Sequence, residues 1–169
     1  MIRKISVIFM AFVLAVSLTA CGEAVKENEE SSVNLGVANP MQACTLQEIA
    51  DDTGVNIVLP AEVFGELSVF RYNFEAPLYQ IGFKYTDGNS YTFRMQKAQE
   101  LTDISGMYYD WAHQEDDSDI LCEIKTNDNG QGICLWFDGD YTYCISMDEN
   151  ASGDALVNMY GVMCAAMGK

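Results

Sequence analysis

Apolar and polar residues alternate with a period of two in the middle of the chain, a pattern typical of β-strands with one buried face. Residues 78–85 and 90–97 both show it, and the turn 86–89 between them predicts an antiparallel pair. One face should be buried and the other solvated. The buried set is Tyr79, Ile81, Phe83, Tyr85, Tyr91, Phe93 and Met95, and the solvated set is Lys84, Thr92, Arg94 and Gln96.

Further apolar or aromatic stretches, each bounded by turn residues, predict more strands. Asp138-Gly139 is a residue pair favoured in type I′ hairpins, and it predicts a tight turn between the last two strands. The predicted strands are residues 55–60, 67–74, 107–113, 119–125, 132–137 and 141–147.

Two segments show helical spacing instead. Residues 44–54 have Thr45 at a capping position with Glu48 three residues later, which is the spacing of a capping box. Near the end of the chain, Ser152 precedes an apolar stripe that repeats every three to four residues. The predicted fold class is therefore α+β: an antiparallel meander of about six to eight strands, with a short N-terminal helix and a C-terminal helix packed on one face.

The first twenty residues form a separate unit. Arg3 and Lys4 precede an apolar run over residues 5–20, which is shorter than the roughly 20 residues of a membrane-spanning helix and typical of a secretory signal. Its end, Leu18-Thr19-Ala20-Cys21, resembles the lipobox of bacterial lipoproteins. That resemblance implies cleavage between Ala20 and Cys21 and lipid attachment to the Cys21 sulfur.

The chain then divides into three parts: a signal peptide over 1–20, a polar flexible tether over 21–40, and a single globular domain over 41–169. Two or three acyl chains give stable attachment where one gives marginal binding. We therefore expect a lipid-anchored monomer on the extracytoplasmic face of a bacterial cell membrane, with the membrane as its partner.

The charge of the chain excludes one large class of partner. The formal net charge is −16, and removal of residues 1–20 takes away two basic residues and no acid, which leaves −18. Nucleic-acid binding depends on Lys and Arg that neutralise phosphates, so such binding is not expected. A polybasic membrane patch is excluded for the same reason.

Five cysteines follow Cys21, an odd number that cannot all pair within one chain. Cys134 and Cys144 should face opposite sides of the sheet if the Asp138-Gly139 loop has two residues. A four-residue loop at 127–130 would place Cys122 and Cys134 on opposite faces of the sheet as well. Cys44 and Cys164 are the candidate disulfide, with unbridged thiols as the alternative. No C-x-x-C motif occurs, so we expect neither a zinc site nor another cofactor.

Residues 113–119 hold four carboxylates, but no calcium-loop pattern accompanies them, so we interpret this segment as a solvated hairpin loop rather than a metal site. His113 could serve as a general base, yet no nucleophile motif such as G-x-S-x-G accompanies it. We therefore predict no catalytic residues.

The stretches "LQEIADDTGVNIVLP" (46–60), "ISGMYYDW" (104–111) and "YTYCISMDENASGDALVNM" (141–159) resemble an uncharacterised domain of lipoproteins and membrane-anchored regulators in Gram-positive bacteria. This resemblance implies the fold rather than an activity. We expect a non-catalytic binding or regulatory domain for a protein, glycan or lipid ligand. The alternatives are a carrier of an apolar or lipid ligand in a curved sheet and, last, a hydrolase.

Overall fold

The computed structural model describes residues 40–117 and 122–169. The predicted signal peptide, Cys21 and nearly all of the tether therefore lie outside the described residues. The described residues belong to one compact unit. Within the described part of the chain, no helix combines the length and apolarity needed to cross a bilayer.

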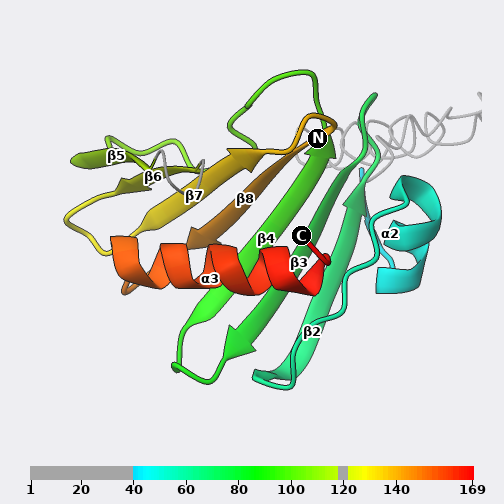
Figure 1. Ribbon diagram of the computed structural model, residues 1–169, viewed down its shortest axis with the longest axis horizontal. Coiled ribbons are helices and arrows are strands. Elements are labelled where there is room, and N and C mark those ends of the chain that lie inside the picture. The colour runs from blue at the N-terminus through cyan, green and yellow to red at the C-terminus, as the bar shows by residue number, and fades with distance from the viewer. Residues whose placement is uncertain (1–39, 118–121) are drawn as a thin grey trace, which may run out of the picture. The chain divides into compact units, whose positions relative to one another are not determined.

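The centre of the domain is one eight-stranded sheet in which all neighbouring strands are antiparallel (Figure 1). This confirms the predicted sheet but not a single meander. Strands β1 to β4 form one meander and β5 to β8 form a second, and the two join where β4 pairs with β8. The strands are β1 (Met41–Ala43), β2 (Val63–Tyr72), β3 (Leu78–Tyr85), β4 (Ser90–Lys97), β5 (His113–Asp117), β6 (Cys122–Thr126), β7 (Gly132–Phe137) and β8 (Tyr141–Met147).

The main core lies between the sheet and the helix α3 (Gly153–Ala166), which runs across the strands in Figure 1. The alternation predicted for β3 and β4 is confirmed, because the apolar set of both strands belongs to this core. From α3, Leu156, Met159 and Met163 are completely buried. Ser152 caps the helix by accepting a hydrogen bond from the Ala155 backbone N–H at 3.2 Å.

Gly132 allows α3 to begin close to the sheet. A Cβ atom at this position would lie 2.7 Å from the Cβ of Ala151 and 3.0 Å from Cδ1 of Leu156. Any other residue would therefore push the start of α3 away from β7.

The sequence pattern predicted that the opposite face of the sheet is solvated, but part of this face is covered by the protein itself. The connection over residues 98–112 carries Ile104, Met107 and Trp111 onto a second apolar cluster. Arg94 fixes this segment, since its Nη1 donates to the carbonyl oxygens of Ile104, at 3.1 Å, and of Ser105. The second cluster contains Leu78, Ile133, Leu135 and Cys144 from the sheet.

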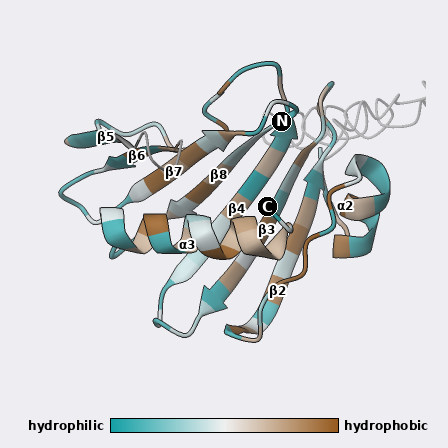
Figure 2. Ribbon diagram, in the orientation of Figure 1, coloured by the Kyte–Doolittle hydropathy of each residue, from teal (hydrophilic) through white to brown (hydrophobic). Residues whose placement is uncertain are grey.

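Three segments differ from their predicted structure. Residues 55–60 form no strand, and the Val58 N–H instead donates to the carbonyl of Ala166 at 2.8 Å, beside the end of α3. The prediction of a strand at 107–113 was also wrong, because the strand β5 begins only at His113. The loop predicted at 113–119 is therefore an edge strand over its first five residues, and Figure 2 shows β5 as hydrophilic.

The β6–β7 turn has five residues rather than four, because Thr126 pairs with Gly132. Asn127 stabilises it: its Oδ1 accepts from the backbone N–H groups of Asn129 and Gln131 at 3.0 and 3.1 Å. Cys122 and Cys134 consequently share a face, contrary to the prediction. The prediction for Cys134 and Cys144 is confirmed, since the two belong to different clusters on opposite faces.

Candidate functional site

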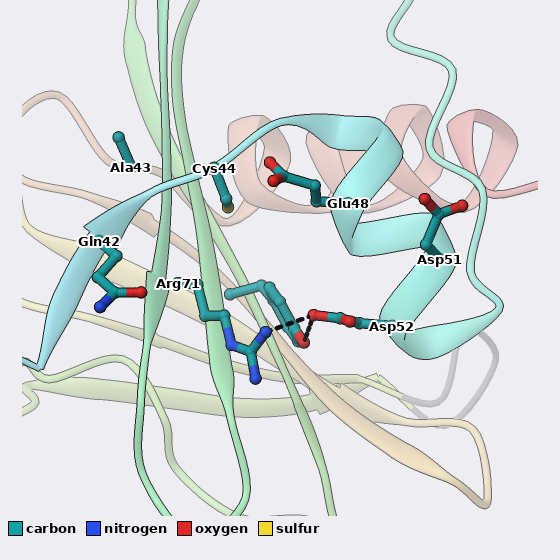
Figure 3. A pocket seen from close by; sticks show the side chains of 8 residues that line it. Gln42, Ala43, Cys44, Glu48, Asp51, Asp52 and Arg71 are labelled. Atoms are coloured by element: carbon teal, nitrogen blue, oxygen red, sulfur yellow. Dashed lines mark hydrogen bonds and ion pairs between the residues drawn. The ribbon is translucent and has the colours of Figure 1, made fainter.

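A pocket of about 260 Å³ lies at one edge of the sheet, between β1, β2 and the helix α2 (Leu46–Thr53) (Figure 3). Strand pairing assembles its floor, because Arg71 of β2 pairs with Gln42 of β1 on one side and Tyr79 of β3 on the other. These three side chains therefore point to the same side of the sheet. The lining residues are Gln42, Ala43, Cys44, Glu48, Asp51, Asp52, Arg71 and Tyr79.

The helix α2 supplies the acidic wall of the pocket. It begins at a capping box, in which the Thr45 N–H donates to Glu48 Oε2 at 2.7 Å and the Glu48 N–H donates to Thr45 Oγ1 at 3.2 Å. Gly54 ends the helix in the left-handed conformation, with φ of 76°. This short helix holds Glu48, Asp51 and Asp52 beside β2.

Asp52 is the centre of a hydrogen-bonded group. Its Oδ2 accepts from Arg71 Nη1 at 2.7 Å and from the hydroxyl of Tyr79 at 2.9 Å, as the dashed lines in Figure 3 mark. The Arg71 guanidinium also lies over the Tyr79 ring, 5.9 Å from its centroid. Burial, helped by the hydrogen bond to Asp52, raises the pKa of Tyr79 to about 12, so the hydroxyl is a neutral donor.

Arg71 does not use all of its donors. Its Nε atom is buried and has no hydrogen-bond partner. Buried N–H groups are almost always paired, because an unpaired one costs about 1–3 kcal/mol. Both this nitrogen and Nε1 of Trp136 in the core are enclosed by the protein itself, so neither is open to a ligand.

Cys44 forms part of the pocket wall, next to the acidic side chains. Burial raises the pKa of its thiol, and the negative charge of Glu48 raises it further. The thiol is consequently protonated at neutral pH and a weak nucleophile.

Asp51 lies in the last turn of α2, where its Oδ1 accepts a hydrogen bond from Gln47 Nε2 at 2.8 Å.

The structure does not bring the residues singled out in the sequence to one place. Cys44 and Cys164 are both thiols, Cys44 in the pocket and Cys164 on α3, where it bonds to Tyr160. Their disulfide stays a prediction, to be decided by comparing intact masses under non-reducing and reducing conditions. His113 is exposed on β5, 3.5 Å from a carboxylate oxygen of Asp128.

The aromatic residues of the second half divide between core and surface. Trp136 and Tyr143 are buried and stacked on each other, with ring centroids 5.1 Å apart. Tyr108, by contrast, is 96% exposed. Among the described residues, no group of three or more His, Cys, Asp or Glu side chains is placed to hold a metal ion.

The sequence analysis missed Arg71, Asp52 and Tyr79 as a group. One sign was available: Arg71 occupies a core-facing position of its strand, two residues after the apolar Val69. A charged side chain at such a position requires a partner.

Fold and pocket together define a small α+β domain with an open antiparallel sheet and a pocket of mixed charge at one sheet edge. Comparisons with protein-family models, curated proteins and solved structures gave no match for this chain.

Proposed function

We propose that this protein is a bacterial lipoprotein, anchored through Cys21 after cleavage at Ala20, whose domain binds a small ligand outside the cell membrane. The lipobox residues Leu18 to Cys21 support the anchor, and the pocket between α2 and the sheet edge supports binding. The proposed role is binding or regulation rather than catalysis: burial and Glu48 raise the pKa of Cys44, the one thiol that lines the pocket, and this makes it a weaker nucleophile.

The finer architecture belongs to the same proposal. We infer that α2 and α3 pack on one face of a single domain, because Ile49 of α2 belongs to the same buried cluster as Met159 of α3. The position of α2 matters for function since this helix carries Asp52 to Arg71.

The observation that carries the binding function is the pocket itself, in which the Arg71 side chain, 37% exposed, lies among the carboxylates of α2. Asp52 takes Nη1 of Arg71, and the exposed part of this side chain can meet a ligand in the pocket.

Thermal shift measurements on the purified full chain test the binding function. The probes are panels of amino acids, sugars, simple carboxylic acids and simple amines. At least one panel should raise the melting temperature of the wild type and not that of Arg71→Gln. Glu66→Gln is the matched control, because Glu66 is exposed on β2 and does not line the pocket. Equal responses in wild type and Arg71→Gln, or no response at all, would overturn it.

The anchor requires a separate test. Cys21→Ser should abolish labelling with a fatty acid and leave the signal peptide uncleaved. A Cys44→Ser chain is the control for loss of a thiol elsewhere. Normal maturation and lipid labelling of Cys21→Ser would contradict the lipoprotein assignment without affecting the pocket.

The carrier alternative has less support. It requires space between the sheet and α3, where Phe93, Ile145 and Met159 are all completely buried within one cluster. That side of the sheet is filled by the protein's own side chains. Native mass spectrometry that detected co-purified lipid on the Cys21→Ser chain would reopen this alternative.

A further inference from the structure

We propose that Phe74, Leu101, Tyr108 and Tyr109 form an aromatic patch that rests on the lipid bilayer to which Cys21 is anchored. This inference rests on the proposed anchor and goes beyond it, because it assigns to the domain a surface that contacts the membrane. It follows from the exposure of these side chains, from the point at which the chain enters the domain, and from the length of chain between that point and Cys21.

The side chains of the patch are large and apolar or aromatic, yet they face solvent. Phe74 is 52% exposed, Leu101 and Tyr109 are each 42% exposed, and Tyr108 is almost completely exposed. A single exposed apolar side chain is ordinary, whereas a group of them marks a surface that contacts a membrane or another molecule. What matters is therefore whether the four lie together.

The second apolar cluster joins the parts of the patch on the face of the sheet opposite α3. Tyr72 and Trp111 both pack on this cluster. Phe74 stacks on Tyr72 with ring centroids 6.0 Å apart, and Tyr109 meets Trp111 edge to face with centroids 5.9 Å apart. Each exposed ring is therefore supported by a half-buried ring that belongs to the same cluster.

The chain that leads to Cys21 enters the domain beside this patch. The Asn73 N–H donates to the carbonyl oxygen of Pro40 at 2.8 Å, so the first described residue lies next to Phe74. Strands β2 and β4 end at the same end of the sheet in Figure 1, and Phe74 and Leu101 each follow one of these strand ends. Of the two ends of the sheet, this is the one from which the chain leaves toward the anchor.

The connection between anchor and domain is short. Cys21 precedes Pro40 by 19 positions, and a segment of that length spans at most roughly 65 Å even when it is fully extended. A group held near a surface by a short flexible linker meets it at an effective concentration of the order of millimolar. Contacts too weak to bind a free domain are therefore sufficient to orient a tethered one.

The chemistry of the patch suits the bilayer interface rather than a charged lipid surface. Tyrosine is enriched at this depth, because its ring is apolar and its hydroxyl remains among the headgroups. Exposed carboxylates adjoin the patch in the sequence at Glu100, Asp103 and Asp110, and they would repel anionic lipids. The contact is therefore apolar in origin, and screening by salt should strengthen it on anionic lipids.

Quenching of Trp111 fluorescence by lipids brominated near the headgroup tests the proposal on the lipidated protein in phosphatidylcholine vesicles. Trp111 should be quenched because it contacts Tyr109 of the patch, whereas Trp136 is buried in the core under α3. The double variant Phe74→Ser, Tyr108→Ser should reduce this quenching at least twofold. Phe64→Ser is the matched control and should leave it unchanged, because Phe64 is about as exposed as Phe74 but lies near the opposite end of β2.

Vesicles of equal parts phosphatidylcholine and phosphatidylglycerol give a second measure. Raising NaCl from about 0.1 M to about 1 M shortens the screening length from roughly 10 Å to roughly 3 Å. The quenching of Trp111 should then increase. A decrease would show that charge, rather than the aromatic patch, draws the domain to lipid, and it would overturn the proposal.

The lipid mass on Cys21, measured on the same sample, separates this proposal from the anchor. If lipid is present and the double variant is quenched as strongly as the wild type, or Trp111 is not quenched at all, the aromatic patch is overturned and the anchor stands. If Cys21 carries no lipid, the anchor and this proposal fall together. Circular dichroism establishes that each variant is folded.

Discussion

Asp138 lies in the turn between β7 and β8, where its carboxylate accepts hydrogen bonds from Lys169 Nζ and, at 2.7 Å, from the Tyr143 hydroxyl. Burial opposes its ionisation, but the bonds from Lys169, the Tyr141 backbone and Tyr143 outweigh this and lower the pKa of Asp138 to about 2. An unfolded aspartate titrates near pH 3.9, about two pH units higher. The fold is therefore stabilised by the ionised form.

We predict that Asp138→Asn lowers the free energy of unfolding by about 1 kcal/mol at pH 7, a value reduced by solvent screening. Because the folded pKa is the lower one, this stabilisation is complete above about pH 5 and disappears as the pH falls from about 4 to 2. Urea denaturation at pH 7, 4 and 2.5 measures it. The difference between wild type and variant should shrink at each step.

Asp140→Asn is the matched control for this pH dependence, since Asp140 lies exposed in the same turn. Its effect on stability should be small at every pH. A difference between wild type and Asp138→Asn that was as large at pH 2.5 as at pH 7 would show that packing, rather than charge, makes Asp138 important.

Arg94 gives the segment 98–112 its position on the sheet. Its Nε donates to Gln80 at 2.8 Å, and its Nη1 reaches the carbonyl oxygens of Ile104 and Ser105. We predict that Arg94→Gln lowers the free energy of unfolding by about 2–3 kcal/mol, because it leaves partly buried acceptors unpaired. Amide hydrogen exchange within residues 102–107 should also accelerate.

The control for Arg94→Gln is Lys97→Gln, which removes an exposed positive charge from the same strand. The two variants should differ both in urea midpoint and in exchange within the segment. Slow exchange at 102–107 in both variants would mean that the apolar contacts of Ile104 and Trp111 hold the segment without Arg94.

The strands that could be predicted are those with long apolar alternation and a strong turn. Strands β3, β4, β7 and β8 have the predicted bounds because each buries one face or both against a cluster. The edge strands lack apolar alternation, because all three residues of β1 are exposed and β5 is polar throughout. Residues 55–60 are apolar because they pack beside α3. The sequence pattern of such a segment does not differ from that of a short buried strand.

The pocket depends on β1, one of the edge strands that were not predicted. Its residues come from three separate segments, and the pairing of β1 with β2 places Gln42 beside Arg71. Without β1, the sequence gives no reason to bring residues 42–44 next to Arg71. Asp52 is one of 25 acidic residues, and nothing in the chain's composition distinguishes it from the rest.

At the scale of the whole molecule, the two meanders meet along the pairing of β4 with β8, where Phe93 lies opposite Ile145. Phe93 is completely buried, and its ring stacks on Tyr143 with centroids 6.0 Å apart. Because α3 covers strands of both meanders in one cluster, we expect the halves to unfold together. Neither half can keep a complete core alone.

Phe93→Ala should therefore lower the free energy of unfolding by about 3–5 kcal/mol, the usual cost of removing a fully buried phenylalanine. Phe64→Ala, on the exposed part of β2 where Phe64 is 48% exposed, is the matched control and should cost less than about 1 kcal/mol. Fluorescence of Trp111 and Trp136, which pack on opposite faces of the sheet, and far-ultraviolet circular dichroism should report the same urea midpoint in Phe93→Ala. Two separate transitions in that variant would show that the meanders are independent units, each stabilised within itself rather than by the β4–β8 pairing.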